Sequence, residues 1–340
     1  MAYTDIDDPS AYFQTKTYSG TGSTTSITND GNSDLQPDWI WIKKRNAVAS
    51  HMLGDSTRGT TKYLSSDLGD AESTATNRVT AFNSDGFSLG NAGSVNNGSH
   101  TYVAWQWKAN GGTTSSNTDG YLTSTVQANT TAGFSIVTFT TDGSTRTVGH
   151  GLGVKPDVIL IASRNVAGGF LFITDVIDGS MDYGVLRSSN AFASIGYNAP
   201  TSTVFEYNDN NTNTQVAYCF AEKQGYSKFG KYTGNGNANG TFVYTGFKPA
   251  FVMWKQTNSA RNWAIMDSTR DPFNEVDQMV WADLTNAEST VTTDDVDFLS
   301  NGFKMRGAGA TTNESGGTYI YMAFAENPFV TSTGIPTTAR

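Results

Sequence analysis

The sequence predicts an all-β protein made of three tandem β-sandwich repeats of jelly-roll or lectin-like type. Composition gives the first observation: aromatic residues make up 12% of the chain and suit strands, while 35 glycines and many Ser, Thr and Asn residues suit turns. The second observation is an apolar segment that begins near a proline and occurs three times, in residues 36–44, 155–163 and 248–256. Short apolar runs between polar residues are typical of strands buried on both faces.

The spacing of these segments divides the chain into four parts. Repeat one covers residues 1–112, a Gly/Ser/Thr-rich linker covers 113–132, the divergent repeat two covers 133–225, and repeat three covers 226–340 with a C-terminal tail. We expect the linker to be flexible or only loosely docked because of its composition. Repeats two and three join directly through residues 222–227, so we expect them to form a rigid pair.

Each repeat is expected to open with a strand that contains aromatic residues and ends at a glycine turn. These segments are residues 12–22, 133–143 and 226–236. Glycine followed or preceded by small polar residues favours a hairpin or short loop. The third segment has one residue more between its aromatic ends, which a β-bulge can accommodate.

A segment that ends in aspartate follows the proline strand. Asp55 and Asp267 begin the sequence Asp-Ser-Thr-Arg, and we match Asp175 to them in repeat two, although repeat two lacks the arginine. In one interpretation Asp55 with Arg58, and Asp267 with Arg270, bind a ligand. In the other the carboxylate caps a turn and the arginine forms a local ion pair, which we favour because the pair recurs with the repeat.

The last strand of each repeat aligns without gaps, as TYVAWQWKA, TQVAYCFAE and TYIYMAFAE. Alternation places large apolar side chains on one face of this strand in every repeat. We expect this face to line the core of its own sandwich. Its members are Val103, Trp105, Trp107, Val216, Tyr218, Phe220, Ile320, Met322 and Phe324.

Two tryptophans lie nearer to predicted loops than the others. Sugar rings stack on exposed aromatic faces, so Trp263 and Trp281 are candidate contacts for a glycan or a protein. Tyr63, Tyr183 and Tyr207 also lie near predicted loops and are candidates for the same reason. The five remaining tryptophans fall inside predicted strands and are expected in the core.

No pattern in the sequence predicts catalysis or a cofactor. The histidines are not at metal-ligand spacing, His150 in VGHGLG is expected to face solvent, and G-x-S-x-G is absent. Asp30, Asn32 and Asp34 match the first three ligand spacings of a calcium loop, but the glycine and glutamate of that loop are missing. We expect no cofactor, and calcium binding is a minor alternative.

Charge and hydropathy argue against nucleic-acid-binding and membrane-inserted classes of protein. The formal net charge is −9 and no Lys/Arg cluster occurs, which argues against nucleic-acid binding. The N-terminus lacks the features of a secretory signal, and no apolar run is long enough to span a bilayer, so membrane insertion is not expected. The single cysteine, Cys219, excludes an internal disulfide.

Several quoted motifs together resemble one repeat family. The opening AYTDIDDPSAYFQTKTYSGTGS with TNDGNSDLQPDWIWIKKRN, then DSTRGTTKYLSSD and FNSDGFSLG, and the third copy with KPAFVMWK, WAIMDSTRDPFN and YIYMAFAENPF, are similar to repeats in structural proteins of tailed phages, especially marine ones. The resemblance implies a virion component of lectin-like β-sandwich modules that assembles with other virion proteins. It brings no catalytic residues with it.

The leading hypothesis is therefore a non-enzymatic virion protein, a tail fibre or adhesin component that binds a host cell-surface receptor or glycan. One alternative is a head (capsid) fibre or decoration protein with a purely structural role, in which the N-terminal arm, residues 2–12, docks onto the particle. Another is a capsule-degrading tail enzyme, which would need a pair of carboxylates in a groove. Symmetric particle components favour a homo-oligomer, and we expect a trimer.

Overall fold

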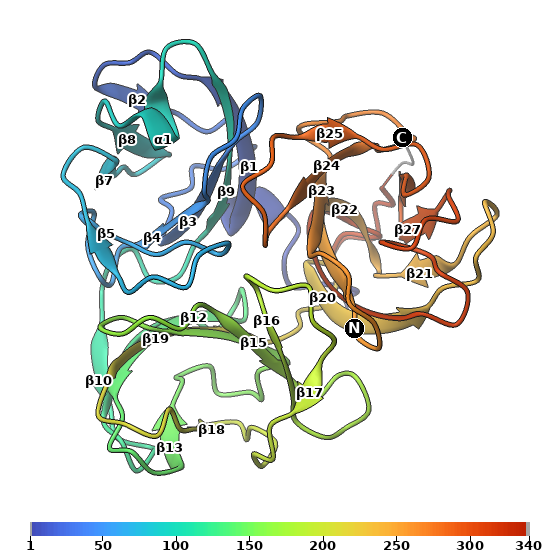
Figure 1. Cartoon of the computed structure of the whole chain (residues 1–340). Coiled ribbons are helices and arrows are strands. Elements are labelled where there is room, and N and C mark those ends of the chain that lie inside the picture. Colours follow the sequence, from blue (N-terminus) through green and yellow to red (C-terminus); the bar gives the residue numbers. More distant parts are fainter. Residues whose placement is uncertain (1, 338–340) are drawn as a thin grey trace.

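Strands dominate the computed structural model, which describes residues 2–337, and the all-β prediction is confirmed. The helical elements among these residues are one 3-10 turn, η1 (Pro9–Ala11), and one short helix, α1 (Gly93–Asn96). Figure 1 shows three lobes around a common centre, and each lobe contains one of the repeats.

Repeat one forms a four-stranded sheet of order β1-β9-β3-β4 and smaller sheets β2-β8-β7 and β5-β6. Its strands are β1 (Phe13–Ser19), β2 (Thr25–Ile27), β3 (Trp39–Lys44), β4 (Met52–Asp55), β5 (Lys62–Tyr63), β6 (Ser73–Thr74), β7 (Val79–Phe82), β8 (Phe87–Leu89) and β9 (Thr101–Trp107).

Repeat two, with the segment before it, forms an eight-stranded sheet of order β10-β11-β12-β19-β14-β15-β16-β17 and the pair β13-β18. These strands are β10 (Ser115–Asn117), β11 (Ser124–Asn129), β12 (Phe134–Thr140), β13 (Arg146–Gly149), β14 (Val158–Ser163), β15 (Leu171–Thr174), β16 (Asp182–Val185), β17 (Ala193–Ser194), β18 (Val204–Tyr207) and β19 (Thr214–Phe220).

Repeat three forms a six-stranded sheet of order β20-β28-β22-β23-β24-β25 and a second sheet β21-β27-β26. Its strands are β20 (Ser227–Thr233), β21 (Phe242–Tyr244), β22 (Phe247–Gln256), β23 (Ala264–Asp267), β24 (Gln278–Trp281), β25 (Ser289–Thr290), β26 (Val296–Leu299), β27 (Gly302–Met305) and β28 (Thr318–Pro328).

The same four antiparallel strands occur in the same order in each lobe: β1-β9-β3-β4, β12-β19-β14-β15 and β20-β28-β22-β23. The proline strand always lies between the last strand and the aspartate strand. Register fixes the matching positions, because Trp39 faces both Trp107 and Asp55, Val158 faces Phe220 and Thr174, and Phe251 faces Phe324 and Asp267. Thr174, one residue before the predicted match Asp175, is thus the counterpart of Asp55 and Asp267.

The large apolar face of the last strand does not line its own sandwich, so that prediction was wrong. Trp105, Tyr218 and Met322 belong to one core that all three repeats share. The opposite face lines the individual sandwiches, where for example Tyr102 packs with the outer-sheet residue Phe87. Alternation separates two faces of a strand, but it carries no information about which neighbour covers each face.

Ring contacts in the shared core join each pair of repeats. Trp39 of repeat one stacks on Tyr218 of repeat two with centroids 4.5 Å apart, and Phe13 of repeat one stacks on Phe324 of repeat three at 5.1 Å. Phe220 of repeat two meets Phe324 edge-on at 5.9 Å. Buried aromatic side chains contribute large apolar areas and specific ring geometry, so this core holds the lobes in a fixed arrangement.

The linker is ordered, and its expected flexibility was wrong. Strand β11 pairs with β12 over six residues, and Gln127 within it is fully buried. Its Nε2 donates to Ser56 Oγ at 3.0 Å and Thr57 Oγ1 at 2.7 Å, while its Oε1 accepts from Gly112 N at 2.8 Å. The free edge of β12 offers backbone hydrogen bonds that composition alone does not reveal.

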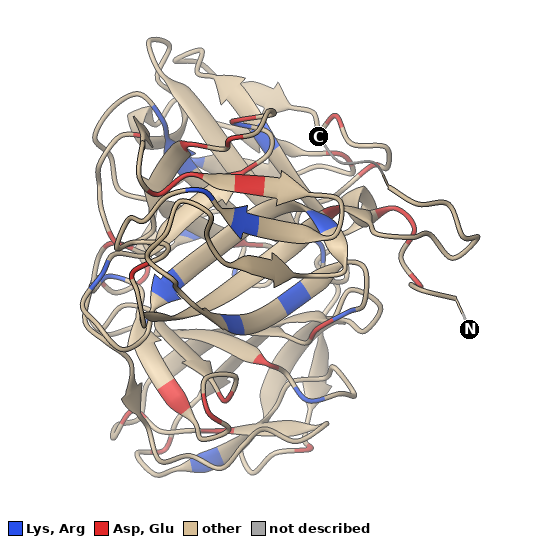
Figure 2. Ribbon diagram, turned by 90° about the vertical axis from the view of Figure 1, so that its right-hand side faces the viewer, with Lys and Arg blue, Asp and Glu red and all other residues tan. Residues whose placement is uncertain are grey.

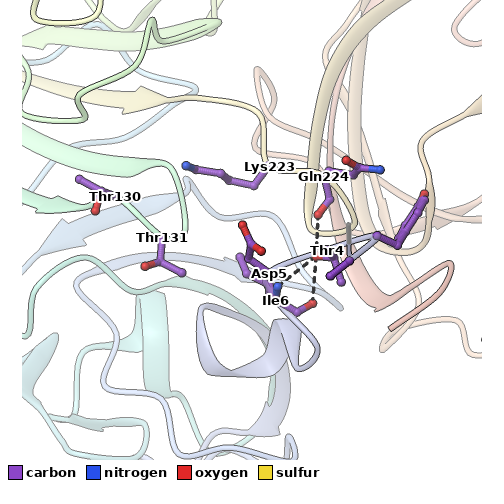
Figure 3. A pocket seen from close by; sticks show the side chains of 9 residues that line it. Thr4, Asp5, Ile6, Thr130, Thr131, Lys223 and Gln224 are labelled. Atoms are coloured by element: carbon purple, nitrogen blue, oxygen red, sulfur yellow. Dashed lines mark hydrogen bonds between the residues drawn. The ribbon is translucent and has the colours of Figure 1, made fainter. Parts of the chain in front are cut away.

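The N-terminal arm lies along repeat three and the end of repeat two. Tyr3 Oη donates to Gly246 O at 2.8 Å, Thr4 Oγ1 donates to Gln224 O at 2.7 Å, and Ser332 N donates to Asp7 Oδ1 at 2.6 Å. Figure 3 shows Thr4 and Ile6 beside Gln224, and Figure 2 shows acidic residues of this N-terminal segment, in red, at one edge of the molecule. Docking of this arm onto a particle stays a prediction.

Candidate functional site

The Asp-Ser-Thr-Arg motif forms a buried ion pair at the end of β4. Asp55 Oδ1 accepts from Arg58 N at 2.7 Å and Oδ2 accepts from Arg58 Nε at 2.5 Å. Neither side chain is exposed to solvent. Arg270 binds Asp267 in the same way after β23, at 2.8 and 2.5 Å.

The pair in repeat one joins repeat one to repeat two. Tyr218 Oη donates to Asp55 Oδ2 at 2.7 Å and accepts from Arg58 Nη2 at 2.9 Å. Glu72 accepts from Arg58 Nη1 at 2.9 Å and from two nitrogens of Arg164, both at 2.9 Å. Burial raises the pKa of Glu72, but the hydrogen bonds and charges of the two arginines outweigh it and hold that pKa below its usual value.

The pair in repeat three joins repeat three to repeat one through matching positions. Trp105 Nε1 donates to Asp267 Oδ2 at 3.0 Å, where Tyr218 occupies the same position in the first network. Glu288 accepts from Arg270 Nη1 at 2.8 Å and from Arg45 Nε and Nη2 at 3.0 and 2.8 Å.

The interface between repeats two and three lacks these polar groups on both sides. Register puts Thr174 where Asp55 lies, and Met322 where Tyr218 and Trp105 lie. A backbone hydrogen bond is common to all three interfaces: Glu72 N donates to Arg164 O at 2.8 Å and Glu288 N donates to Arg45 O at 2.7 Å. At the interface of repeats two and three, Phe192 N donates to Thr257 O at 2.8 Å. Phe192 thus replaces the glutamate, and its ring lies 5.6 Å from that of Trp263. Methionine cannot donate to a carboxylate, which explains why repeat two lacks the motif.

The two candidate tryptophans also lie at interfaces. Trp263 is 1% exposed, and its Nε1 donates to Val185 O at 3.1 Å in repeat two. Trp281 is half-buried, and its carbonyl oxygen lies 2.9 Å from His51 Nε2 of repeat one. The six candidate residues therefore surround joints between repeats, with Arg58 and Arg270 only 9% and 6% exposed.

A hollow of about 640 Å³ opens in repeat two, and we call it the repeat-two hollow. Two loops enclose it, one after β14 and one between β18 and β19. Its lining residues are Ser163, Val166, Ala167, Gly168, Gly169, Leu171, Tyr207, Asp209, Asn211, Thr212 and Asn213. The volume lies within the range of about 300–1,000 Å³ that small-molecule sites occupy.

The loop beside this hollow is shorter in repeat two than the matching loops of the other repeats. The connection before the last strand spans residues 208–213 in repeat two, but 90–100 and 306–317 in the other repeats. Tyr102 Oη and Tyr319 Oη hold those longer loops, donating to Gly93 O at 3.0 Å and Ala310 O at 2.8 Å. Gln215 takes the tyrosine position in repeat two and donates instead to Asp209.

Polar groups of the repeat-two hollow have hydrogen-bonding capacity to spare. Asn213 is only 7% exposed, and its Oδ1 accepts from Asn165 Nδ2 at 3.1 Å, whereas its Nδ2 donates to no group among residues 2–337. Tyr207 is 5% exposed, and its hydroxyl likewise has no hydrogen-bond partner in the described chain. Burial, then the nearby charge of Asp209, raise the pKa of Tyr207, so the hydroxyl stays protonated.

Asp209 holds the floor of the hollow in place. Its Oδ1 accepts from Thr141 Oγ1 at 2.9 Å and from Asn211 N at 3.1 Å, and its Oδ2 accepts from Gln215 Nε2. A carboxylate has about four acceptor positions, so one remains for a ligand hydroxyl. The sequence pointed to Tyr207 as a candidate contact but did not bring it together with Asp209 and Asn213. The available signal was the shortened loop together with glutamine in place of tyrosine.

The structure also shows where His150 and the calcium-like segment lie. His150 is fully buried rather than solvent-facing, because its Nδ1 accepts from Leu152 N at 3.2 Å and its Nε2 contacts Thr201 O, and burial lowers its pKa. Asp30 of the calcium-like segment pairs with Lys16 at 2.8 Å. Within residues 2–337 no group of three His, Cys, Asp or Glu side chains is placed to hold a metal ion. Over the same residues no helix has the length and apolarity to cross a membrane.

Comparison with protein-family models gives one reported match, over residues 8–328, to a family described as a domain of unknown function, DUF7483. The search of curated proteins gives no match.

Proposed function

We propose that this chain, which belongs to the DUF7483 family, is a non-enzymatic virion surface protein that binds a receptor on the host cell. The observation that carries the proposal is that the repeated polar motif joins the repeats to one another. Asp55, Arg58, Asp267 and Arg270 are turned inward and join the repeats, so contact with a partner falls to the outer sheets and loops.

A rigid body that presents loops suits binding. The shared aromatic core and two ionic interfaces fix the three lobes, so little conformational entropy is lost when a loop contacts a partner. Divergence supports the same function, because repeat two keeps the four-strand order but has lost the tyrosine-anchored loop of the other repeats.

Position and copy number in intact particles test the virion part of the proposal. We expect the protein in purified particles at the few copies typical of a tail component, measured by quantitative mass spectrometry and immunogold labelling. Several hundred copies spread over the head would favour the alternative of a decoration protein.

Cell binding tests the receptor part. We expect fluorescently labelled full-length chain to bind host cells saturably and to compete with its unlabelled form. If the protein is a tail component of the particles but the labelled chain does not bind host cells, the receptor function is contradicted.

A further inference from the structure

We propose that the repeat-two hollow binds a neutral sugar ring. This inference deepens the proposed function and rests on it for its biological meaning, since it names the site and the chemical class of the receptor. It stands on the geometry of one cavity and on the hydrogen-bonding capacity of the side chains that line it.

The lining matches the two surfaces of a pyranose ring. Val166 and Leu171 offer an apolar edge for the C–H face of a sugar, and Val166 is 39% exposed. Tyr207, Asp209 and Asn213 provide polar groups on another side of the same cavity. Small-molecule sites commonly combine an apolar lining with a few placed polar groups that set orientation.

The unpartnered groups supply both donors and acceptors. Asn213 Nδ2 can donate, Tyr207 Oη can donate and accept, and Asp209 Oδ2 has one acceptor position left. Each hydroxyl of a sugar is itself a donor and an acceptor, so a vicinal pair can satisfy this set. Because neither Tyr207 Oη nor Asn213 Nδ2 has a partner in the described chain, a sugar hydroxyl can bond to them without breaking an internal hydrogen bond.

Charge selects among sugars. Asp209 is the one charged residue among those described as lining the hollow. A carboxylate there repels uronic acids, sialic acids and phosphorylated sugars and accepts a hydrogen bond from a hydroxyl of a neutral sugar. We therefore assign neutral hexoses rather than acidic glycans to this site.

At the matching position the other repeats carry a longer loop that a tyrosine holds in place, so we expect the sugar site in repeat two alone. Tyr102 Oη accepts from Asn97 N at 2.8 Å, and Tyr319 Oη accepts from Glu314 N at 2.8 Å. Each tyrosine thus uses its hydroxyl to hold the longer loop. One site per chain is expected.

The test compares Tyr207→Phe with Tyr18→Phe in the full-length chain. Tyr207 packs its ring against Phe139 with centroids 6.0 Å apart, and phenylalanine keeps that contact while removing only the unpartnered hydroxyl. Tyr18 lies in repeat one, and its hydroxyl donates to Val95 O at 2.8 Å, so its loss affects the fold and not the hollow.

Titration calorimetry with methyl glycosides and short oligosaccharides of neutral hexoses, and with the matching uronates, gives the readout. We expect one neutral-sugar site per chain, about tenfold weaker binding in Tyr207→Phe, and an unchanged urea midpoint in that variant. Tyr18→Phe should show the opposite pattern, a lower urea midpoint with unchanged affinity. Asn213→Asp, which keeps the acceptor for Asn165 but removes the free donor, should also bind weakly.

The outcomes separate this inference from the proposed function. Equal affinity of Tyr207→Phe and the natural chain, or equal binding of neutral sugars and uronates, would overturn the assignment of the hollow. Saturable cell binding without any sugar binding would also overturn it while leaving the receptor function intact. Sugar binding that responds to Tyr207→Phe in a chain that does not bind cells would support the site and contradict the receptor function.

Discussion

At the scale of single residues, the repeated Asp–Arg pairs connect repeats that are far apart in sequence. Arg58 is fully buried between Asp55 and Glu72, and Tyr218 completes the network from the neighbouring repeat. A buried charge costs much unless every partner is present, so these side chains act as a set. Their recurrence in the sequence reflects this shared joining role.

Replacing Arg270 by methionine tests the joining role. The variant leaves Asp267 and Glu288 with one cation fewer in a buried site, so we expect the free energy of unfolding to fall by about 3–5 kcal/mol in urea titrations. Arg146→Met serves as the control, because Arg146 pairs with Asp142 on the surface and its loss should have no measurable effect. Equal midpoints for the two variants would contradict the role.

Asp283 predicts a pH dependence of stability. Burial raises its pKa from 3.8 to about 6, while its Oδ1 accepts from Trp263 N at 3.0 Å. Below pH 4 the residue is protonated in both states, but between pH 4 and 6 only the unfolded state ionises, so this residue's contribution to stability falls as pH rises. Asp283→Asn keeps the acceptor and removes the ionisation.

The measurement is the difference in unfolding free energy between Asp283→Asn and the natural chain across pH 3.5 to 8. As the pH rises, the variant should become more stable relative to the natural chain. The gain in relative unfolding free energy between the lowest pH and pH 7 should reach up to about 3 kcal/mol. A difference that does not change with pH would show that the carboxyl group ionises alike in both states.

At the scale of elements, the segment before repeat two shows how an available sheet edge orders a polar sequence. Strand β11 runs beside β12, and Gln127 connects it to Ser56 and Thr57 of repeat one. Asp38 fixes the end of repeat one just before this segment, because its carboxylate accepts from Ala109 N at 2.7 Å and from Gly111 N at 2.9 Å. The chain therefore passes between repeats one and two as ordered structure.

Hydrogen exchange checks this order. We expect amides of β11 that pair with β12 to exchange far more slowly than those of the exposed loop 165–167, because ladder hydrogen bonds must open first. Gln127→Ala should speed exchange in β11. Exchange of β11 as fast as that of the exposed loop in the natural chain would show that the segment is a flexible linker after all.

At the scale of the whole molecule, three repeats share one core and depend on one another. The inner face of repeat two contains Leu160, Phe172 and Phe220, which are covered largely by its neighbours. The chain itself thus places three copies of one sheet around a centre, an arrangement that separate chains of a trimer would otherwise supply. Assembly of whole chains into a trimer stays a prediction.

Repeat two expressed alone with the segment that completes its sheet, as residues 113–225, tests this dependence. We expect it to expose the apolar inner face and to aggregate, self-associate or bind a hydrophobic dye, without a sharp thermal transition. Light scattering and thermal melts would be compared with the full-length chain. A monomer that unfolds cooperatively would show that the shared core is dispensable for this repeat.

Much of the strand framework could be predicted from the sequence. Proline followed by apolar residues predicted β3, β14 and β22. Alternation along the last strand predicted that one of its faces carries the large apolar side chains. The aspartate of the motif was placed correctly in repeats one and three, but its counterpart in repeat two was displaced by one residue. A single-residue shift reverses the side of the sheet, and only the register resolves it.

The sequence by itself determined the class of fold, the succession of strand segments along each repeat, and the polar motif that repeats one and three share. These follow from local periodicity and from turn residues, which act over a few positions along the chain. Only the tertiary structure decided that the apolar faces meet in one core, that Tyr218 completes the pair of Asp55, and that a hollow opens beside Tyr207. The shared core and the bond between Tyr218 and Asp55 join segments more than 100 residues apart, and the hollow joins two loops, residues 163–171 and 207–213. Local patterns do not record which of these segments meet.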